Sequence, residues 1–351
     1  MTELIINKTL EYLKVPAVVG HEKLFMDYLE KDLKALNLTT DKYRRLLAVH
    51  GNEPFSAILC AHIDRHGLIS LGSEEYVYAA KYIKEMTYNE NDQLSEEVHR
   101  NIIRRFEGER VFAYDPKTGD KIGEGVIEAY PELVDGQAIF YVQAMMEIAD
   151  SIPLAYAREA HIEDNWLKGQ IDNVISIGAI YQLFKDGFQG TVLFATEEEI
   201  GKSWMHIVSY LKKEKIKTQD ILVLDTSPFT ESKQVEEGHI ILRNRDFSEE
   251  FSVSLVERLK ERCEKLGLVY TFKDEFLLSE GKMTEQLGST ELGRLIQGSK
   301  GLWSGASIQI PTLQYHTSSE TTTVKAIENY YKFLRNILIE DQLCLSICVK
   351  K

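Results

Sequence analysis

Seven residues of this chain have side chains that bind divalent metal ions or transfer protons, and each follows an apolar run. They are His62 and Asp64 in AHIDRHG, Asp172 in GQIDN, Glu198 and Glu199 in FATEEEIG, Asp225 in LVLDTS and His316 in QYHTSSE. Open α/β sheets place their sites outside the carboxyl ends of the strands. The pattern therefore predicts a site for metal-assisted hydrolysis.

The ligand types favour two metal ions held close together. Zn²⁺ and related ions accept imidazole and carboxylate, and two-metal hydrolases hold their ions about 3.5–4 Å apart around a shared carboxylate. We expect Asp172 to be the shared ligand, with His62 and Asp225 completing one site and Glu199 and His316 the other. The predicted cofactors are two divalent metal ions, Zn²⁺ or Co²⁺.

Two further acidic residues are expected to assist the metal ligands. Asp64 comes two residues after His62 on an extended segment, where its carboxylate can accept the second imidazole N–H and orient the ring. Glu198 stays unligated in this scheme and serves as the general base. A lone His-x-Asp or an acidic triplet is weak evidence, and Glu197 is interpreted as a solvated helix start. The metal hypothesis rests on the occurrence of all these motifs together, in this order along the chain.

Composition indicates a globular protein and argues against several partners. The 351 residues are 44% apolar, and the formal charge of -14 repels nucleic acid. The N-terminal segment has no unbroken apolar region of the secretory type, and no stretch is long and apolar enough to span a membrane. The four cysteines show no disulfide framework, and Cys344 and Cys348 are interpreted as two thiols. We expect a cytoplasmic protein.

The apolar patterns predict an α/β fold with a mainly parallel sheet flanked by helices. Residues 22–36 have helical spacing, and from Asp172 onward short apolar runs alternate with helical stretches. A closing helix is expected after the hydroxyls of Thr321 to Thr323. Residues 69–163 are β-rich and broken by turns, so we expect a small β domain inserted between residues 1–68 and 164–351, which together form the catalytic domain.

The motif order resembles the TET-type (tetrahedral) aminopeptidases, a family that includes glutamyl and deblocking aminopeptidases. The long interval between His62 and Asp172 places the insertion where that family has it, and HTSSE looks like its closing His motif. The resemblance covers nearly the whole chain. It implies hydrolysis of N-terminal residues from peptides, in which a water between the metal ions gives its proton to Glu198 and attacks the carbonyl. It also implies a cis peptide bond after Asp172.

The chain departs from the family pattern at several positions near these motifs. Asn173 stands where the family usually has Asp, Arg65 where it has Glu, and Glu291 where it has Asp. The segment IGKSWM after Glu199 also differs. These positions are expected to lie behind the ligands or in the pocket, where they affect substrate preference and catalytic efficiency.

Two alternatives remain at this point. The same metals would serve an amidohydrolase or deacylase acting on a non-peptide amide, and a self-assembling homologue could keep the fold without catalysis. The resemblance further implies homo-oligomers, from a dimer up to a tetrahedral dodecamer, built through the insertion at residues 69–163. His66 has no ligand spacing and is interpreted as structural or pocket-lining.

Overall fold

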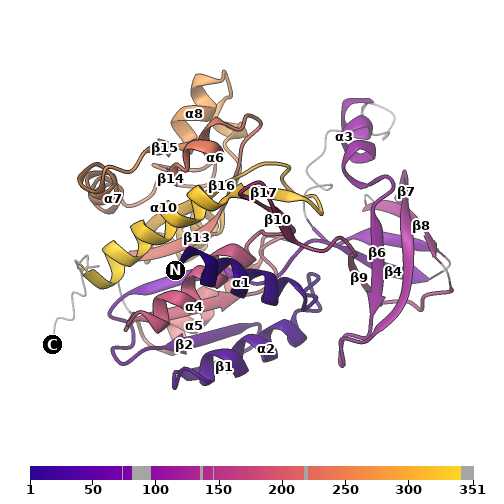
Figure 1. The fold of residues 1–351 in the computed structure, drawn as a ribbon, viewed down its shortest axis with the longest axis horizontal. Helices are drawn as coiled ribbons and strands as arrows, with labels where there is room; N and C mark the ends of the chain where they lie inside the picture. The colour runs from indigo at the N-terminus through magenta and orange to yellow at the C-terminus, as the bar shows by residue number, and fades with distance from the viewer. Residues whose placement is uncertain (73, 81–95, 135–136, 145, 217–219, 341–351) are drawn as a thin grey trace.

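The chain forms a large α/β body with a smaller β-rich body beside it (Figure 1). The computed structural model describes residues 1–351 except 73, 81–95, 135–136, 145, 217–219 and 341–351. Cys344 and Cys348 lie outside the described residues, whereas Cys60 and Cys263 are buried and unpaired.

An eight-stranded sheet forms the centre of the large body. Its order is β1 (Thr39–Tyr43), β2 (Leu46–His50), β12 (Thr191–Ala195), β3 (Ile58–His62), β13 (Asp220–Pro228), β16 (Ser304–Thr312), β14 (Ile240–Leu242) and β15 (Tyr270–Phe272). The central strands β12, β3, β13 and β16 are parallel, while β1, β2 and β14 join through antiparallel pairings. β3 and β12 are buried along their whole length, as expected for parallel strands covered on both faces.

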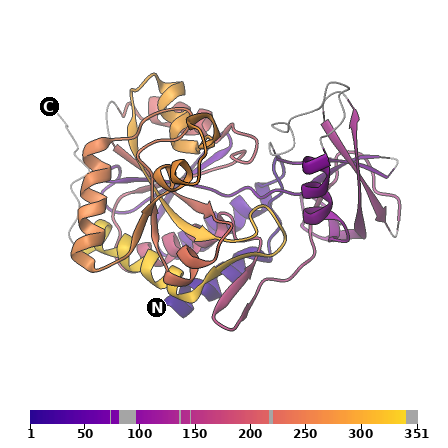
Figure 2. The same ribbon diagram turned by 90° about the horizontal axis from the view of Figure 1, so that it is seen from above.

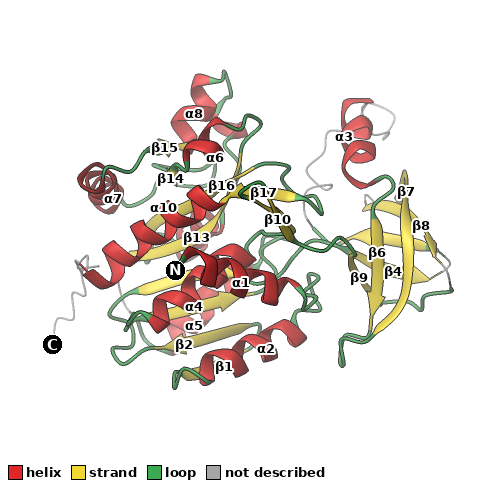
Figure 3. Cartoon of the chain, in the orientation of Figure 1, coloured by secondary structure: helices red, strands yellow, loops and turns green. Residues whose placement is uncertain are grey.

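Helices cover both faces of this sheet, which confirms the predicted fold class (Figure 3). One group contains α1 (Thr2–Leu13), α4 (Val174–Lys185) and α10 (Val324–Arg335), and α5 (Ser203–Lys213) packs with α9 (Glu291–Ser299) on the other face. A Cβ at Gly178 in α4 would lie 2.4 Å from Thr9 Oγ1 in α1, so glycine permits this close approach. The remaining helices are α2 (Lys23–Lys34), α6 (Lys233–Glu237), α7 (Val253–Leu266), α8 (Lys273–Ser279), the 3₁₀-helix η2 (Thr284–Gln286) and the π-helix η3 (Asn336–Glu340).

The smaller body is a closed β-barrel with one helix (Figure 2). Its strands, in barrel order, are β4 (Leu68–Gly72), β5 (Glu75–Tyr78), β8 (Gln137–Ala144), β7 (Lys121–Val134), β6 (Arg110–Tyr114) and β9 (Pro153–Tyr156), and α3 (Glu96–Phe106) packs on it. Phe106, Phe140 and Leu154 are fully buried in a core separate from that of the α/β body. The boundaries 69–163 and the role in assembly stay predictions.

A small three-stranded sheet joins two parts of the chain that carry predicted ligands. Its order is β10 (His161–Glu163), β11 (Trp166–Gly169) and β17 (Glu320–Thr323). In the antiparallel pairing of β11 with β17, Gly169 is opposite Glu320. The segment leading to Asp172 therefore runs beside the segment that follows His316.

Candidate metal centre

The predicted ligands meet at the carboxyl edge of the central parallel strands. His62 is the last residue of β3, Asp225 lies in β13, Glu199 follows β12, and His316 follows β16. Asp172 lies between β11 and α4. Because the strands are parallel, their carboxyl ends lie at one edge of the sheet, as the sequence pattern indicated.

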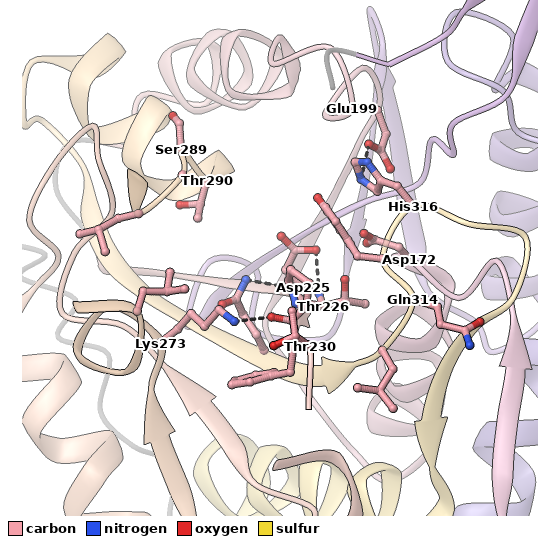
Figure 4. Close-up of a pocket in the computed structure, with 18 of the residues that line it drawn as sticks. Asp172, Glu199, Asp225, Thr226, Thr230, Lys273, Ser289, Thr290, Gln314 and His316 are labelled. Atoms are coloured by element: carbon pink, nitrogen blue, oxygen red, sulfur yellow. Dashed lines mark hydrogen bonds and ion pairs between the residues drawn. The ribbon is translucent and has the colours of Figure 1, made fainter. Parts of the chain in front are cut away.

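Two clusters of ligand atoms form there, and they share one residue (Figure 4). His62, Asp172 and Asp225 form one cluster, and Asp172, Glu199 and His316 form the other, with ligand atoms within 4.8 Å of one another in each. Asp172 is the shared carboxylate. His62 Nε2 lies 3.2 Å from Asp172 Oδ1 and 3.4 Å from Asp225 Oδ1, and His316 Nε2 lies 3.1 Å from Glu199 Oε2.

The charges of these clusters suit divalent cations. Burial raises the pKa of Glu199 well above its usual value, and the Asp172 carboxylate raises it further. Burial alone would lower the pKa of His62, but hydrogen bonds to neighbouring carboxylates outweigh it and raise this pKa well above its usual value. Glu199 Oε1 is buried and has no hydrogen-bond partner among the described residues. Carboxylates crowded in a buried site repel one another, and bound cations would relieve this repulsion. The donor set therefore fits two metal ions.

The peptide bond between Asp172 and Asn173 is cis, as expected. The Asn173 amide donates to the main-chain oxygen of Leu224 at 2.7 Å, next to the ligand Asp225.

Asp64 and Glu198 lie beside the two clusters but outside them. The Asp64 carboxylate accepts the main-chain N–H groups of Glu198 and Glu199 at 3.1 and 3.0 Å. His62 Nδ1 is nearer the main-chain oxygen of Asp64, at 3.1 Å, than its carboxylate, at 3.7 Å. The expected hydrogen bond from the ring to the Asp64 carboxylate is therefore replaced by one to the Asp64 main-chain oxygen, and the carboxylate holds the Glu198–Glu199 backbone instead.

Glu198 faces the cavity and has a cationic partner. Arg294 in α9 donates to Glu198 Oε1 at 3.2 Å. Burial raises the pKa of Glu198 to about 8, while His62 and Arg294 oppose the shift. Glu197 differs from the expected solvated helix start, because its carboxylate lies 2.8 Å from His206 Nε2 and it has a positive φ.

Glu320 is a buried carboxylate that the sequence analysis missed. Its two oxygens accept the main-chain N–H groups of Asp172 and His316, both at 2.9 Å. It thus fixes the backbone of two ligands from different parts of the chain. The only sequence signal is its place as the last residue of the quoted HTSSE motif.

The positions that depart from the family pattern lie behind the cavity. Arg65 donates to the main-chain oxygens of Leu13 and Val15 at the end of α1. Glu291 is 1% exposed, and burial raises its pKa to about 7. His66 is buried between the rings of Tyr78, Tyr156 and His316, which fits the structural interpretation.

A cavity of about 1270 Å³ opens over both clusters. Its walls include side chains that sequence reasoning missed, namely Arg105 and Glu109 of the β-barrel region, and Arg243, Lys273 and Arg294 of the α/β body. No local sequence motif marks any of these five residues.

Comparison with solved structures identifies the fold. No family model matches the sequence, and no curated protein matches it significantly. An aminopeptidase from the archaeon Desulfurococcus kamchatkensis is 13% identical, with a TM-score of 0.72 and 99% of both chains covered. The TET1 peptidase of Pyrococcus horikoshii is 16% identical, with a TM-score of 0.67 and 96% of this chain and 99% of that chain covered.

This chain has the TET aminopeptidase fold. A TET aminopeptidase from the marine sediment archaeon Thaumarchaeota archaeon SCGC AB-539-E09 gives the same result, with 15% identity, a TM-score of 0.68 and coverage of 97% of this chain and 99% of that chain. Identities this low show a common fold, and the resemblance read from the motifs is confirmed at that level. Within the described residues, no helix has the length and apolar character needed to cross a membrane.

Proposed function

We propose that this protein is a metallo-aminopeptidase that removes N-terminal residues from peptides. The observation that carries the proposal is the pair of clusters sharing Asp172 at the base of a cavity, with Glu198 beside them. His62, Asp172 and Asp225 would hold one divalent ion, and Asp172, Glu199 and His316 the other, with Zn²⁺ or Co²⁺ as the expected metals. When bound, the ions would polarise the carbonyl and lower the pKa of water.

The protein's own residues supply the proton transfers and the fixed geometry. Glu198 accepts the proton of the attacking water and returns it to the leaving amine nitrogen. The Asp64 carboxylate accepts the main-chain N–H of Glu198 and so fixes its backbone. Arg294 donates a hydrogen bond to the Glu198 carboxylate and so holds the side chain. Glu320 fixes the backbone of Asp172 and His316. Such preorganisation keeps the reacting groups aligned.

Assembly into homo-oligomers belongs to the same proposal. The Pyrococcus horikoshii peptidase can assemble into a tetrahedron or a large octahedral shell, and this chain has its fold. We propose that the β-barrel provides the contact, with a dimer as the smallest form.

Metal analysis and a substrate panel together test the function. Protein reloaded with Zn²⁺ or Co²⁺ should bind two ions per chain and hydrolyse aminoacyl-p-nitroanilides. Fewer than two ions would contradict the assigned centre. Hydrolysis of N-acyl amides alone would indicate a deacylase, and two ions without turnover on either class would indicate an inactive homologue.

A further inference from the structure

The loop that carries His316 is joined to the β-barrel by a hydrogen bond. This loop connects β16 to β17 and lies on the side of the α/β body that faces the barrel (Figure 1). Ser318, two residues after His316, is 1% exposed, and its hydroxyl donates to Glu109 Oε2 at 2.6 Å. Glu109 lies between α3 and β6 of the barrel region, and its other oxygen accepts from Arg158 at 3.2 Å. A hydrogen bond of this length to a carboxylate is of the strong, charge-assisted kind.

The backbone of this loop needs contacts that hold its shape. Gln314 and His316 have φ values of 56° and 55°, in the left-handed region that is unfavourable for residues other than glycine. Such conformations persist only where the surrounding structure enforces them. Glu320 accepts the His316 N–H at the base of the loop, and Glu109 holds Ser318 between these two residues. The loop is therefore held from both bodies of the molecule.

A second contact connects the barrel to the His316 ring. The centre of this ring lies 5.0 Å from that of His66, and the His66 ring lies 5.9 Å from Tyr78 and 5.2 Å from Tyr156. Tyr78 is the last residue of β5 and Tyr156 the last of β9, so both belong to the barrel. The barrel thus supports the loop through Glu109 and the imidazole through His66.

The other unshared ligand of the same cluster also lies at the barrel. We call the set of Asp172, Glu199 and His316 the second cluster. Ile200, the residue after Glu199, packs against an apolar group that includes Tyr114 of the barrel. Both ligands that belong to the second cluster alone therefore lie next to the interface between the two bodies.

The first cluster, formed by His62, Asp172 and Asp225, is held within the α/β body. His62 ends β3 and Asp225 lies in β13, which are paired strands of the central sheet. The His62 ring contacts Asp64, Asp172 and Asp225, and Asp225 also accepts the main-chain N–H of Thr226. The two clusters therefore differ in what supports their ligands, the central sheet for one and the barrel interface for the other.

We propose that the β-barrel is a positioning part of the metal centre, in which Glu109 acts through Ser318 to hold His316 and so sets the affinity of the second cluster for its ion. The inference rests on the metal centre of the proposed function and goes beyond it, because it gives the two ions unequal support. Residues that hold metal ligands typically change metal affinity by about 10–100-fold. Loss of the contact between Glu109 and Ser318 should weaken binding to the second cluster by about that factor and leave the first cluster unchanged.

Isothermal titration calorimetry of the full-length, chelator-treated protein with Zn²⁺ measures these affinities without requiring turnover. Glu199→Gln leaves only the first cluster complete, and His62→Ala leaves only the second, so each affinity can be measured on its own. In the His62→Ala protein, Glu109→Ala and Ser318→Ala should each lower the Zn²⁺ affinity about 10-fold or more. In the Glu199→Gln protein, the same substitutions should leave the Zn²⁺ affinity unchanged.

Three further variants separate positioning from a general loosening of the structure. Glu109→Gln keeps an oxygen that can accept the Ser318 hydroxyl, so it should retain most of the affinity that Glu109→Ala loses. The double variant Glu109→Ala with Ser318→Ala should lose no more affinity than either single variant, because two residues that act through one contact are not additive. Tyr114→Phe is the matched control. It removes a different hydrogen bond between the two bodies, from the Val18 N–H to Tyr114 Oη at 3.2 Å, and should leave both affinities unchanged.

The outcomes distinguish failure of this inference from failure of the proposed function. Circular dichroism checks the fold of each variant, and Ser318→Ala, which removes a single oxygen atom, keeps the test valid if Glu109→Ala does not fold. Two ions in the wild-type protein, with Ser318→Ala either unchanged or weakened equally at both clusters, would overturn the positioning role and keep the metal centre. Fewer than two ions in the wild-type protein would contradict the metal centre itself.

Discussion

Glu198 and Glu199 are adjacent in the chain, yet the structure gives them different surroundings. Glu199 lies 3.1 Å from His316 and belongs to a ligand cluster, whereas Glu198 lies outside both clusters and contacts Arg294. Asp64 accepts both of their main-chain N–H groups, which fixes the two side chains in their different directions. The proposed division into ligand and base therefore depends on Asp64.

Substitution of each glutamate should separate these roles. Glu198→Gln should keep two metal ions per chain and lower kcat about 10²–10⁴-fold, the usual contribution of a general base. Glu199→Gln should lose metal. Stoichiometric metal analysis beside kinetics measures both effects, and Glu197→Gln is the matched control from the same acidic triplet. Metal loss in Glu198→Gln with retention in Glu199→Gln would reverse the assignment.

Burial lowers the pKa of Lys273 to about 7, and this has a consequence for stability. Between pH 7 and about 10.5, the unfolded chain carries a proton that the folded chain releases, so this residue makes the free energy of unfolding rise with pH. The folded state therefore bears the full cost of the buried charge below pH 7. Lys273→Met should remove that cost, so its effect on stability should be more favourable at pH 6 than at pH 9.

Urea unfolding of metal-free wild type and Lys273→Met at the two pH values measures this difference. Comparison of the two proteins cancels the titration of the metal ligands, which they share. Lys282→Met provides the control, because an exposed lysine should show the same effect at both pH values. An identical effect of Lys273→Met at pH 6 and pH 9 would contradict the lowered pKa.

Some residues of the candidate site could be predicted from the sequence, and others could not. Four of the five proposed ligands could be predicted because they lie in or after strands of the eight-stranded sheet, whereas Asp172 follows β11 of the three-stranded sheet and was found from the order of the motifs. Glu320 and Arg294 could not, because their partners Asp172 and Glu198 lie 148 and 96 positions away. Arg243 and Lys273 are neighbours only through the pairing of β14 with β15, which have three residues each. Only the folded sheet reveals that pair.

At the scale of elements, α10 illustrates how a local signal fixes a helix start. Thr323 is the N-cap, and its hydroxyl accepts the main-chain N–H of Ala326 at 3.0 Å while donating to the Val235 oxygen at 2.8 Å. The predicted cap region, Thr321 to Thr323, included this residue. Residues 22–36 likewise contain α2, with Phe25 and Leu29 buried.

Thr323→Ala should destabilise the protein, because it removes the cap of α10 and the hydrogen bond to the Val235 oxygen, which then keeps the weaker contact from the Gly238 N–H. We expect a loss of about 1–2 kcal/mol in the free energy of unfolding, measured by urea denaturation. Thr323→Ser keeps the hydroxyl and should recover most of the loss. A destabilisation of Thr323→Ser equal to that of Thr323→Ala would assign the effect to the lost methyl group.

The three-stranded sheet was not predicted, for a physical reason. β10, β11 and β17 have three to four residues each, and an apolar period needs a longer run to be visible. Its stability comes from pairing segments far apart in sequence, Trp166 with Thr323 for example. The mainly parallel sheet and the β-rich character of the insertion could be predicted, because their strands carry longer apolar or alternating runs.

At the scale of the whole molecule, the β-barrel stands beside the α/β body with its own core (Figure 2). Ile122, Val126 and Met146 in this region are more than a third exposed. Ile122 and Val126 both lie in β7, so this strand offers an apolar surface for contact with another chain.

Sedimentation velocity at several concentrations should therefore show a dimer or a larger species. Ile122→Glu with Val126→Glu should shift the distribution toward monomers, because a carboxylate in an apolar contact is costly. Met205→Glu, an exposed apolar residue of α5, serves as the control. A wild-type chain that stays monomeric at micromolar concentration would contradict assembly, and unchanged oligomers of the double variant would place the contact elsewhere.

The barrel also interrupts the chain between two proposed ligands, and this has an entropic consequence. His62 and Asp172 are 110 positions apart and 3.2 Å from each other, so their contact closes one long loop. Closing a flexible loop of that length costs about 4 kcal/mol, whereas a folded barrel brings its two ends together beforehand. The proposed metal affinity would thereby depend on folding of the barrel. An ion bound by His62 and Asp172 would hold the two ends of the insertion together. Destabilising the barrel should therefore weaken metal binding, although no strand of the barrel contributes a ligand.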